Sequence, residues 1–437
     1  MLTPKSPSLY LILIVAGSTF SAIRAEDWPQ WRGVARDGVW RETGIVETFP
    51  SAESTPKWEV SIGAGYTGPT VAGNRVYLMD RQTKPEQIER ILCFDRDTGK
   101  QIWVQSYPRK YTIGYKAGPR ASVTIHEGKA YALGAMGDVH CLDAETGEIK
   151  WKVDGLKEFE IQMPIWGTAA SPLIFENLVI LQMGGKEACF VGLDKQTGET
   201  KWKAVDDKPS YSSPILIQQG AQPVVAAYSG GNVLGLDPRS GKEFWRIKFP
   251  NRQMPIGSAT PITDGKNLFC TSFYDGALNI ELDPNSPTAK LLWHRNGQSE
   301  MKTDALQSII STPVIDKGYV YGVDSYGELR CLDLKTGDRL WEDLSATPKS
   351  RWSTIHFVKH VEDGKPDRWF LFNERGELLI GELSPKGFKE LSRTKIIEPT
   401  TEQLPQRGGV CWSHPAFANK CIFARNDEKL ICICLAK

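Results

Sequence analysis

One short stretch decides the fold of this chain: Asp143-Ala144-Glu145-Thr146-Gly147-Glu148-Ile149-Lys150-Trp151. It is a copy of the signature Asp-x-x-(Thr/Ser)-Gly-x-x-x-Trp, which recurs along the 437 residues with tryptophans 43 to 51 residues apart. A period of this length is typical of folds built from one stacked or radially arranged supersecondary unit. The signature therefore predicts a repeat protein. Its copies span residues 95–103, 143–151, 194–202, 237–245, 283–293 (a degenerate copy) and 333–341.

Each repeat is predicted to be a four-stranded sheet. Before the last signature lie three short runs rich in β-branched and aromatic residues, at 312–315, 319–323 and 328–332, which are separated by turn residues. The signature itself is a predicted turn, in which Asp accepts bonds from backbone amides and Gly adopts a left-handed conformation. Its Trp then lies on the fourth strand, where it can fill the wedge between neighbouring sheets. Four strands per repeat around an axis predict a β-propeller blade, and the absence of a 3.6-residue periodicity disfavours a helical array.

The inner strands give a count of eight blades. The seventh blade has lost its signature at 382–387, and the eighth ends after a third strand at 430–435. We predict that residues 56–60 supply its missing outer strand, with Trp58 in the place of the other blade tryptophans. The predicted fold is therefore an all-β, eight-bladed propeller of four-stranded antiparallel blades, whose last blade is closed by an N-terminal strand so that no sheet edge stays exposed. The column of inner-strand residues on which the count rests is Gly68-Pro69, Ser122-Val123, Ser171-Pro172, Ser213-Pro214, Thr260-Pro261, Thr312-Pro313, Thr354-Ile355 and His414-Pro415.

Residues 1–25 are predicted to be a signal peptide. Lys5 precedes an apolar run at 9–20, and Ala22-Ile23-Arg24-Ala25 offers small residues for cleavage. The run is too short for a comfortable membrane span, although an uncleaved anchor is the alternative. We therefore expect an exported, periplasmic or extracytoplasmic protein with no transmembrane span after cleavage. Residues 26–55 form an N-terminal extension, and the propeller occupies 56–437. Within the extension, the segment from Asp27 to Gly38 is expected to pack on the side of the propeller.

Charge and cysteine usage exclude several classes of site. A net charge of +1 and the absence of a basic run argue against nucleic-acid binding. The nine cysteines do not form a disulfide framework, because four of them occupy one column in different blades, beyond disulfide reach. Cys421 could still pair with Cys432 or Cys434 on the adjacent strand. The scattered histidines and the lack of a metal-binding cysteine motif predict no dedicated metal site. The four column cysteines are Cys93, Cys141, Cys331 and Cys432.

The signature resembles the repeat of quinoprotein-type propellers, the family of the pyrroloquinoline quinone (PQQ) dehydrogenases and of an outer-membrane assembly lipoprotein with the same fold. The opening Asp27-Trp28-Pro29-Gln30-Trp31-Arg32-Gly33 also resembles the start of exported PQQ-like repeat proteins. The resemblance covers residues 27–437. It is specific for the fold and weak for function, because the fold hosts both enzymes and scaffolds.

The resemblance leaves two functions to weigh. Quinoprotein alcohol dehydrogenases typically carry a disulfide between adjacent cysteines and a calcium held by Glu and Asn, and neither motif can be matched here. The first hypothesis is a non-catalytic exported scaffold that recognises a protein or cell-envelope partner and needs no cofactor. The alternative is a PQQ-dependent oxidoreductase, with calcium, that acts on an alcohol or sugar. A calcium-stabilised structural propeller is a third possibility, but no Asp-rich ligand loop supports it.

A ligand would meet one column of residues at the mouth of the central channel. The candidate cofactor-binding residues in this column are Arg120, Tyr211, Trp352 and Trp412. Arg120 could pair with a carboxylate in a bidentate fork, and the aromatic rings could stack on a flat ring. Alternatively, the aromatic residues plug the channel and Arg120 bonds to blade carbonyls. No catalytic residue is predicted, since no Gly-x-Ser-x-Gly elbow occurs. The full column is Tyr66, Arg120, Ala169, Tyr211, Ser258, Ile310, Trp352 and Trp412.

Overall fold

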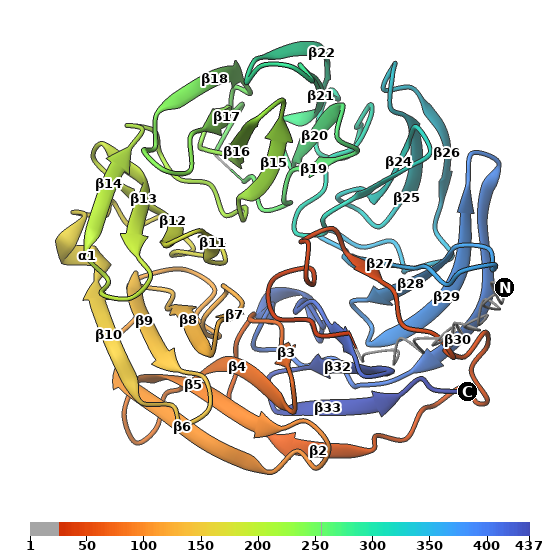
Figure 1. Ribbon diagram of the computed structural model, residues 1–437. Helices are drawn as coiled ribbons and strands as arrows, with labels where there is room; N and C mark the ends of the chain where they lie inside the picture. Colours follow the sequence, from red (N-terminus) through yellow and green to blue (C-terminus); the bar gives the residue numbers. More distant parts are fainter. Residues whose placement is uncertain (1–25, 255) are drawn as a thin grey trace, which may run out of the picture.

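Eight antiparallel four-stranded arrays surround a central axis in the computed structural model (Figure 1). The model describes residues 26–254 and 256–437, so the predicted signal peptide lies outside the described residues. The predicted eight-bladed, all-β propeller is confirmed. From the inner to the outer strand, the first four blades are β3 (Thr70–Ala72), β4 (Arg75–Gln82), β5 (Ile88–Asp95) and β6 (Gln101–Pro108); β7 (Thr124–His126), β8 (Lys129–Leu133), β9 (Asp138–Asp143) and β10 (Ile149–Asp154); β11 (Leu173–Phe175), β12 (Leu178–Gly185), β13 (Ala188–Asp194) and β14 (Thr200–Ala204); β15 (Ile215–Gln219), β16 (Gln222–Tyr228), β17 (Asn232–Leu236) and β18 (Glu243–Lys248).

The other four blades complete the ring and include the closure. The fifth to seventh blades are β19 (Ile262–Thr263), β20 (Asn267–Ser272), β21 (Gly276–Leu282) and β22 (Ala289–Arg295); β23 (Val314–Asp316), β24 (Tyr319–Val323), β25 (Leu329–Asp333) and β26 (Arg339–Asp343); β27 (Ile355–His360), β28 (Arg368–Asn373), β29 (Glu377–Ser384) and β30 (Gly387–Lys395). The eighth is β31 (Ala416–Ala418), β32 (Cys421–Arg425), β33 (Lys429–Cys434) and the N-terminal β2 (Trp58–Ser61).

The signature forms the joint between neighbouring blades. The Asp143 carboxylate accepts the backbone N–H groups of Glu145 and Thr146 at 3.0 and 2.9 Å, which holds the turn. The indole N–H of Trp151 then donates to the carbonyl of Lys195, in the turn of the next blade, at 3.1 Å. Gly198 of that turn has a φ of 77°, and a Cβ there would lie 2.7 Å from the Trp151 ring. Gly and Trp therefore recur together because, where the following turn keeps its Gly, the Trp packs on it.

The degenerate fifth signature shows how the joint adapts. The other signature turns carry Gly at this position, whereas this turn carries Pro287. Trp245, the tryptophan of the preceding blade, has a different hydrogen-bond partner. The Trp245 indole donates to the side-chain carbonyl of Gln219 at 2.9 Å, and the Gln219 amide donates to the backbone carbonyl of Thr288 at 2.8 Å. A glutamine thus bridges the tryptophan and the altered turn.

The ring closes as predicted, by pairing the N-terminal strand with the last one. β2 runs antiparallel to β33, with Trp58 opposite Cys432, and Figure 1 shows the two strands side by side. The Trp58 indole donates to the carbonyl of Arg96 in the first signature turn at 2.8 Å. This contact repeats the geometry of the other blade joints.

The N-terminal extension corrects one expectation. It does not pack on the outer side of the ring: its first part crosses one end of the central axis, where Figure 1 shows the red segment over the centre. Trp28 forms a two-residue bridge with the first inner strand, and the indole of Trp31 donates to a hydroxyl in the fifth blade at 2.9 Å. Arg36 is buried, and its guanidinium donates to inner-strand carbonyls of the third and fourth blades. The blade positions that 28–36 reaches by hydrogen bonds are Val71, Ile125, Pro172, Pro214, Thr260 and Pro313, one on each of six blades.

A fifth strand in the seventh sheet also belongs to this extension. β1 (Val39–Trp40) pairs in parallel with the inner strand β27, and its Trp40 is fully buried. Because the extension occurs once in the chain, the repeat pattern carries no information about this strand.

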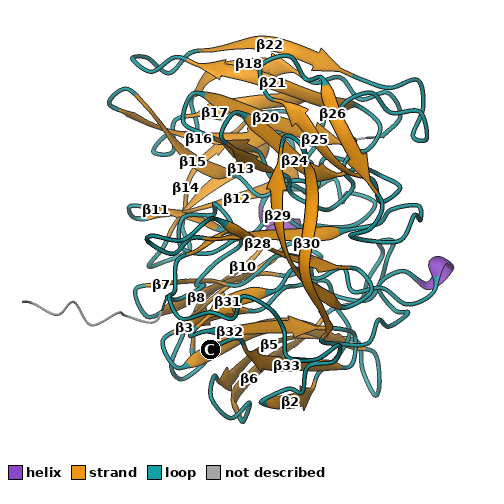
Figure 2. Ribbon diagram, turned by 90° about the vertical axis from the view of Figure 1, so that its right-hand side faces the viewer, coloured by secondary structure: helices purple, strands orange, loops and turns teal. Residues whose placement is uncertain are grey.

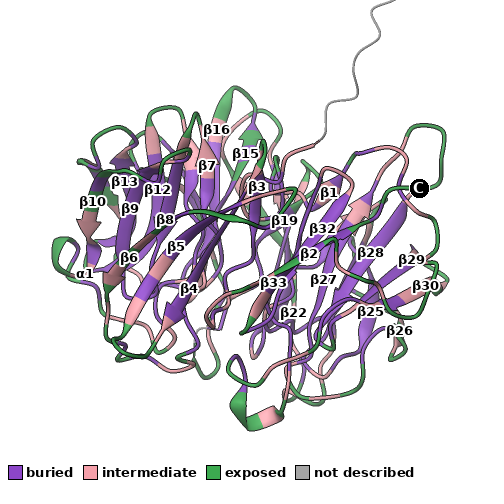
Figure 3. Cartoon of the chain, turned by 90° about the horizontal axis from the view of Figure 1, so that it is seen from below, coloured by how far each residue is buried: buried purple, intermediate pink, exposed green. Residues whose placement is uncertain are grey.

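The connections gather at two faces, which Figure 2 shows edge-on. One face, called the loop face below, carries the connections from each blade's outer strand to the next inner strand, at 62–69, 109–123, 155–172, 205–214, 249–261, 296–313, 344–354 and 396–415. The helix α1 (Gly155–Glu158) and the 3-10 helix η1 (Pro405–Arg407) lie in two of these connections. The strands are mostly buried, whereas exposed residues concentrate in the loops (Figure 3). In the described part of the chain, no helix has the length and apolarity needed to cross a membrane.

Candidate functional site: an aromatic cavity on the axis

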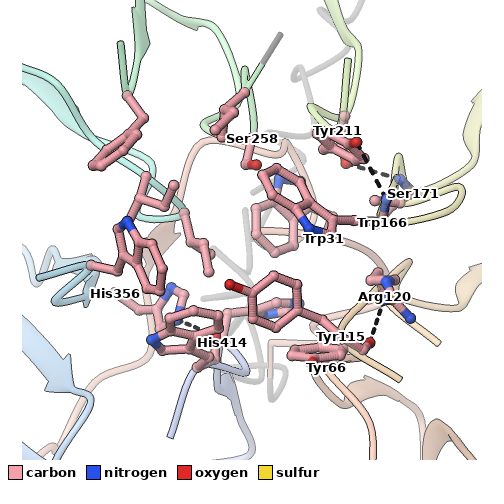
Figure 4. Close-up of a pocket in the computed structure, with 18 of the residues that line it drawn as sticks. Trp31, Tyr66, Tyr115, Arg120, Trp166, Ser171, Tyr211, Ser258, His356 and His414 are labelled. Atoms are coloured by element: carbon pink, nitrogen blue, oxygen red, sulfur yellow. Dashed lines mark hydrogen bonds between the residues drawn. The ribbon is translucent and has the colours of Figure 1, made fainter. Parts of the chain in front are cut away.

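A cavity of about 430 Å³ opens on the loop face at the central axis (Figure 4). All eight connections of that face contribute to its lining. The structure brings Arg120, Tyr211, Trp352 and Trp412 together here, along with the other four members of the predicted column. Their cofactor-binding role stays a prediction. The residues that the column analysis missed include Trp31, Tyr115, Trp166, Phe273, Tyr274, Arg351 and His356.

Aromatic rings in tilted and edge-to-face contact form one continuous wall of the cavity. The ring of Tyr115 lies 6.4 Å from that of Trp412 and 5.8 Å from that of Trp166, between centroids. Trp166 in turn lies 5.0 Å from Tyr211, whose hydroxyl accepts the Trp166 backbone N–H at 3.4 Å. These four side chains come from four different inter-blade connections. The wall therefore forms only when the blades are assembled into the ring.

Arg120 is held by its own loop. Its guanidinium donates to the carbonyls of Gly114, Tyr115 and Gly118, with Nη2 at 2.9 Å from the first and 2.5 Å from the second. The guanidinium carbon also lies 4.9 Å from the centre of the Tyr66 ring, within cation–π range. Both terminal nitrogens therefore bond to carbonyls, but these belong to the connection that carries Arg120 and not, as the second sequence interpretation expects, to a blade. A bidentate fork to a ligand would require these bonds to break.

Two neutral histidines and Trp31 form the floor. Burial, with a smaller contribution from the neighbouring His356, lowers the pKa of His414 to about 3; burial likewise lowers the pKa of His356 to about 4. His414 Nε2 lies 2.7 Å from the Ser122 hydroxyl, and His356 Nε2 donates to the carbonyl of Trp412 at 2.9 Å. Trp31 packs edge-on against His414 with centroids 4.2 Å apart. The N-terminal extension thus closes the channel from the opposite end.

The charged groups at the rim are already paired. Arg351 donates to the carboxylate of Glu300 at 2.7 Å and lies over the Trp352 ring at 4.4 Å. Arg407, which the sequence places near this zone, forms an ion pair with the fully buried Glu374 and does not line the cavity. Burial raises the pKa of Glu374, while the Arg407 charge opposes that rise.

The lining can be compared with the needs of a quinone cofactor and its calcium. Calcium takes oxygen ligands, mainly carboxylates and carbonyl or amide oxygens. Among the described residues that line the cavity, none is Asp, Glu, Asn or Gln. Across residues 26–254 and 256–437, moreover, no group of three or more His, Cys, Asp or Glu side chains is arranged to hold a metal ion. The residues present therefore do not fit PQQ with calcium, and we derive no reaction step through that cofactor.

The cysteines are free thiols in the described structure. Cys421 lies directly opposite Cys434 in the β32–β33 pair, on the far side of the blade from the axial cavity. The four column cysteines are fully or almost fully buried, as the sequence analysis expected of small core residues.

Comparison with known proteins identifies the family. The family model described as outer membrane protein assembly factor BamB matches residues 87–343. A protein of that name from Burkholderia pseudomallei is 26% identical over 316 residues, 69% of this chain and 72% of the relative. The 1-butanol dehydrogenase (quinone) of Thauera butanivorans is 26% identical over 219 residues, which cover 46% of this chain and 33% of the enzyme.

Solved structures of both kinds of relative share the fold of this chain. BamB from Moraxella catarrhalis superposes with a TM-score of 0.56 at 18% identity and covers 86% of this chain and 96% of that one. The quinohemoprotein alcohol dehydrogenase from Comamonas testosteroni has a TM-score of 0.60 at 15% identity and covers 94% and 81%. At these identities the structures establish the propeller fold alone. The match of the family model over more than half of the sequence shows that the chain belongs to the family of the outer membrane protein assembly factor BamB.

Proposed function

We propose that this protein is a non-catalytic, exported propeller that recognises a protein partner of the cell envelope through its loop face. One observation carries the proposal. Among the described residues, the two most exposed large apolar side chains are Met301, at 71%, and Ile165, at 59%, and both lie on loop-face connections. Both side chains lie on the face onto which the axial cavity opens, where they are available for contact with a partner.

Three further observations support a scaffold over an enzyme. The ionisable side chains of the cavity are either paired, as Arg351 is with Glu300, or held neutral by burial, as His356 and His414 are. No carboxylate among the described lining residues offers a general base or a calcium ligand. The relative from Burkholderia pseudomallei, which aligns over most of both chains, is named for outer membrane protein assembly. Export to the periplasm, through the predicted signal at 1–25, is part of this proposal.

Site-specific photocrosslinking in the native host tests the proposal. A photoreactive residue is placed at 165 or 301 on the loop face, and at Leu340 on the outer strand β26 as a control, because Leu340 is 46% exposed and faces away from the axis. We expect one discrete envelope-protein adduct from both loop-face positions and none from 340. Adducts from 340 alone, or no adduct from either loop-face position, would overturn the proposal.

A further inference from the structure

We propose that the axial cavity is a binding site for a neutral saccharide, which stacks on the aromatic wall and bonds to the polar groups of the floor. This ligand is separate from the protein partner proposed above, and the two can succeed or fail independently.

Size and shape suit a small ring-shaped ligand. A volume of about 430 Å³ lies within the range of ordinary small-molecule sites. The wall of Tyr115, Trp166 and Tyr211 presents ring faces and edges to the cavity (Figure 4). Tyr and Trp side chains combine an apolar ring face with a hydroxyl or N–H group. They suit a ligand that is apolar on one side and forms hydrogen bonds on the other, and a pyranose ring has this character.

The charges in the lining disfavour a cation. An aromatic cage can hold a quaternary ammonium ion by cation–π attraction. Here, however, the guanidinium groups of Arg120 and Arg351 already lie over the rings of Tyr66 and Trp352. Glu300 balances the charge of Arg351, but no carboxylate of the described lining balances that of Arg120. A cationic ligand would therefore enter a site that is already positive.

The same groups do not offer an anion site. Nη1 and Nη2 of Arg120 donate to three loop carbonyls, so a carboxylate would have to displace those bonds. Arg351 donates to Glu300. The two floor histidines are neutral, because burial holds the pKa of each well below the usual range. An uncharged ligand meets none of these costs.

The cavity retains hydrogen-bonding capacity for such a ligand. The hydroxyl oxygens of Ser171 and Ser213, which line the cavity, each accept a backbone N–H, at 3.0 and 2.9 Å, and donate to no described acceptor, which leaves their protons for a ligand. A hydroxyl-rich ring offers acceptors for these protons.

The backbone at the rim supports a binding role. Tyr115 and Trp352 have φ values of 49° and 66°, in the left-handed region that large side chains rarely adopt. Such strained residues concentrate at ligand clamps, where the surrounding structure holds them in place. Both residues line the cavity.

Titration of the mature protein, residues 26–437, tests the proposal. Cellobiose and N,N′-diacetylchitobiose are the probes, followed by tryptophan fluorescence and by calorimetry. We expect saturable binding of at least one disaccharide. Trp166→Ala should weaken it roughly three- to tenfold, because one stacking face is lost. Trp341→Phe is the matched control, since Trp341 lies on the outer strand β26, and it should leave the affinity unchanged.

Charged analogues make the test decisive. Choline and gluconate, in parallel titrations, should not compete with the disaccharide. Saturable binding of choline or gluconate without binding of either disaccharide would overturn the inference, as would no response to either disaccharide from folded protein. A Trp341→Phe variant that weakens binding as much as Trp166→Ala would also overturn it, because the site would then lie elsewhere. None of these outcomes changes the crosslinks expected at 165 and 301.

Discussion

At the scale of single residues, the fold depends on a repeated contact between one Trp and one Gly. Trp151 covers Gly198, Trp103 covers Gly147, and Trp58 covers Gly99 in the same way. The Gly is required twice, by its positive φ and by the indole packed against it. These two requirements can be separated experimentally.

Gly198→Ala should lower the free energy of unfolding by about 2–4 kcal/mol, because it adds both left-handed strain and a clash with the Trp151 ring. Gly128→Ala is the matched control: Gly128 has a φ of 72°, but nothing lies within 4 Å of its Cβ position, so only the strain of about 1 kcal/mol remains. Urea denaturation of the three proteins measures the difference. Equal losses in both variants would show that the tryptophan contact contributes little.

The floor histidines predict a pH dependence. Burial lowers the folded-state pKa of His414 to about 3, whereas an unfolded histidine titrates near 6.5. Between these values only the unfolded chain binds the proton, so stability is full above about pH 6.5 and is lost as pH falls through this window. His414→Gln should make the decline between pH 6 and pH 4 shallower, by up to about 1.4 kcal/mol per pH unit. A slope that is identical before and after His414→Gln contradicts the assignment.

At the scale of elements, the N-terminal extension has the largest structural role that the repeat pattern does not reveal. The blades and the cavity column could be predicted because each position recurs eight times, so errors at one blade are corrected by the others. The segment 27–38 occurs once, and its arginines and tryptophans find partners on blades that are distant in sequence. The partners of Arg120 were equally hidden, since they depend on how the loop at 114–118 folds back.

Arg36→Ala should destabilise the protein by about 3 kcal/mol, because carbonyls of the third and fourth blades lose a buried charged donor. Arg36→Lys should restore little of this, since an ammonium cannot reproduce the planar fork that reaches Gln30, Pro172 and Pro214 together. Thermal unfolding of both variants checks the prediction. Full stability in Arg36→Lys would mean that charge alone, and not the fork, fastens the segment.

At the scale of the whole molecule, closure of the ring by β2 joins the two ends of the chain. The backbone N–H of Lys57 donates to the carbonyl of Cys432 at 2.7 Å, and the side chain of Lys57 makes an exposed ion pair with Asp97 at 3.2 Å. Sheet closure removes an edge that would otherwise be open, so this single backbone bond contributes to the integrity of the ring.

Lys57→Pro removes the backbone donor and should lower the free energy of unfolding by about 1–2 kcal/mol, with faster proteolysis of the N-terminal extension. Lys57→Ala keeps the donor and loses only the exposed ion pair, whose contribution is small. Limited proteolysis and urea denaturation compare the two. If Lys57→Ala is as unstable as Lys57→Pro, the side chain and not the strand pairing controls closure.

The central claim is that this propeller is a scaffold rather than a quinone enzyme. The measurement that tests it most directly is a titration of the mature protein, residues 26–437, with PQQ and calcium, followed by dye reduction with a panel of alcohols and sugars. The account predicts no saturable tryptophan quenching and no turnover, because the described lining offers no carboxylate or amide side chain for calcium and both terminal nitrogens of Arg120 are engaged. Tight, saturable quenching that Arg120→Ala abolishes, together with turnover, would contradict it.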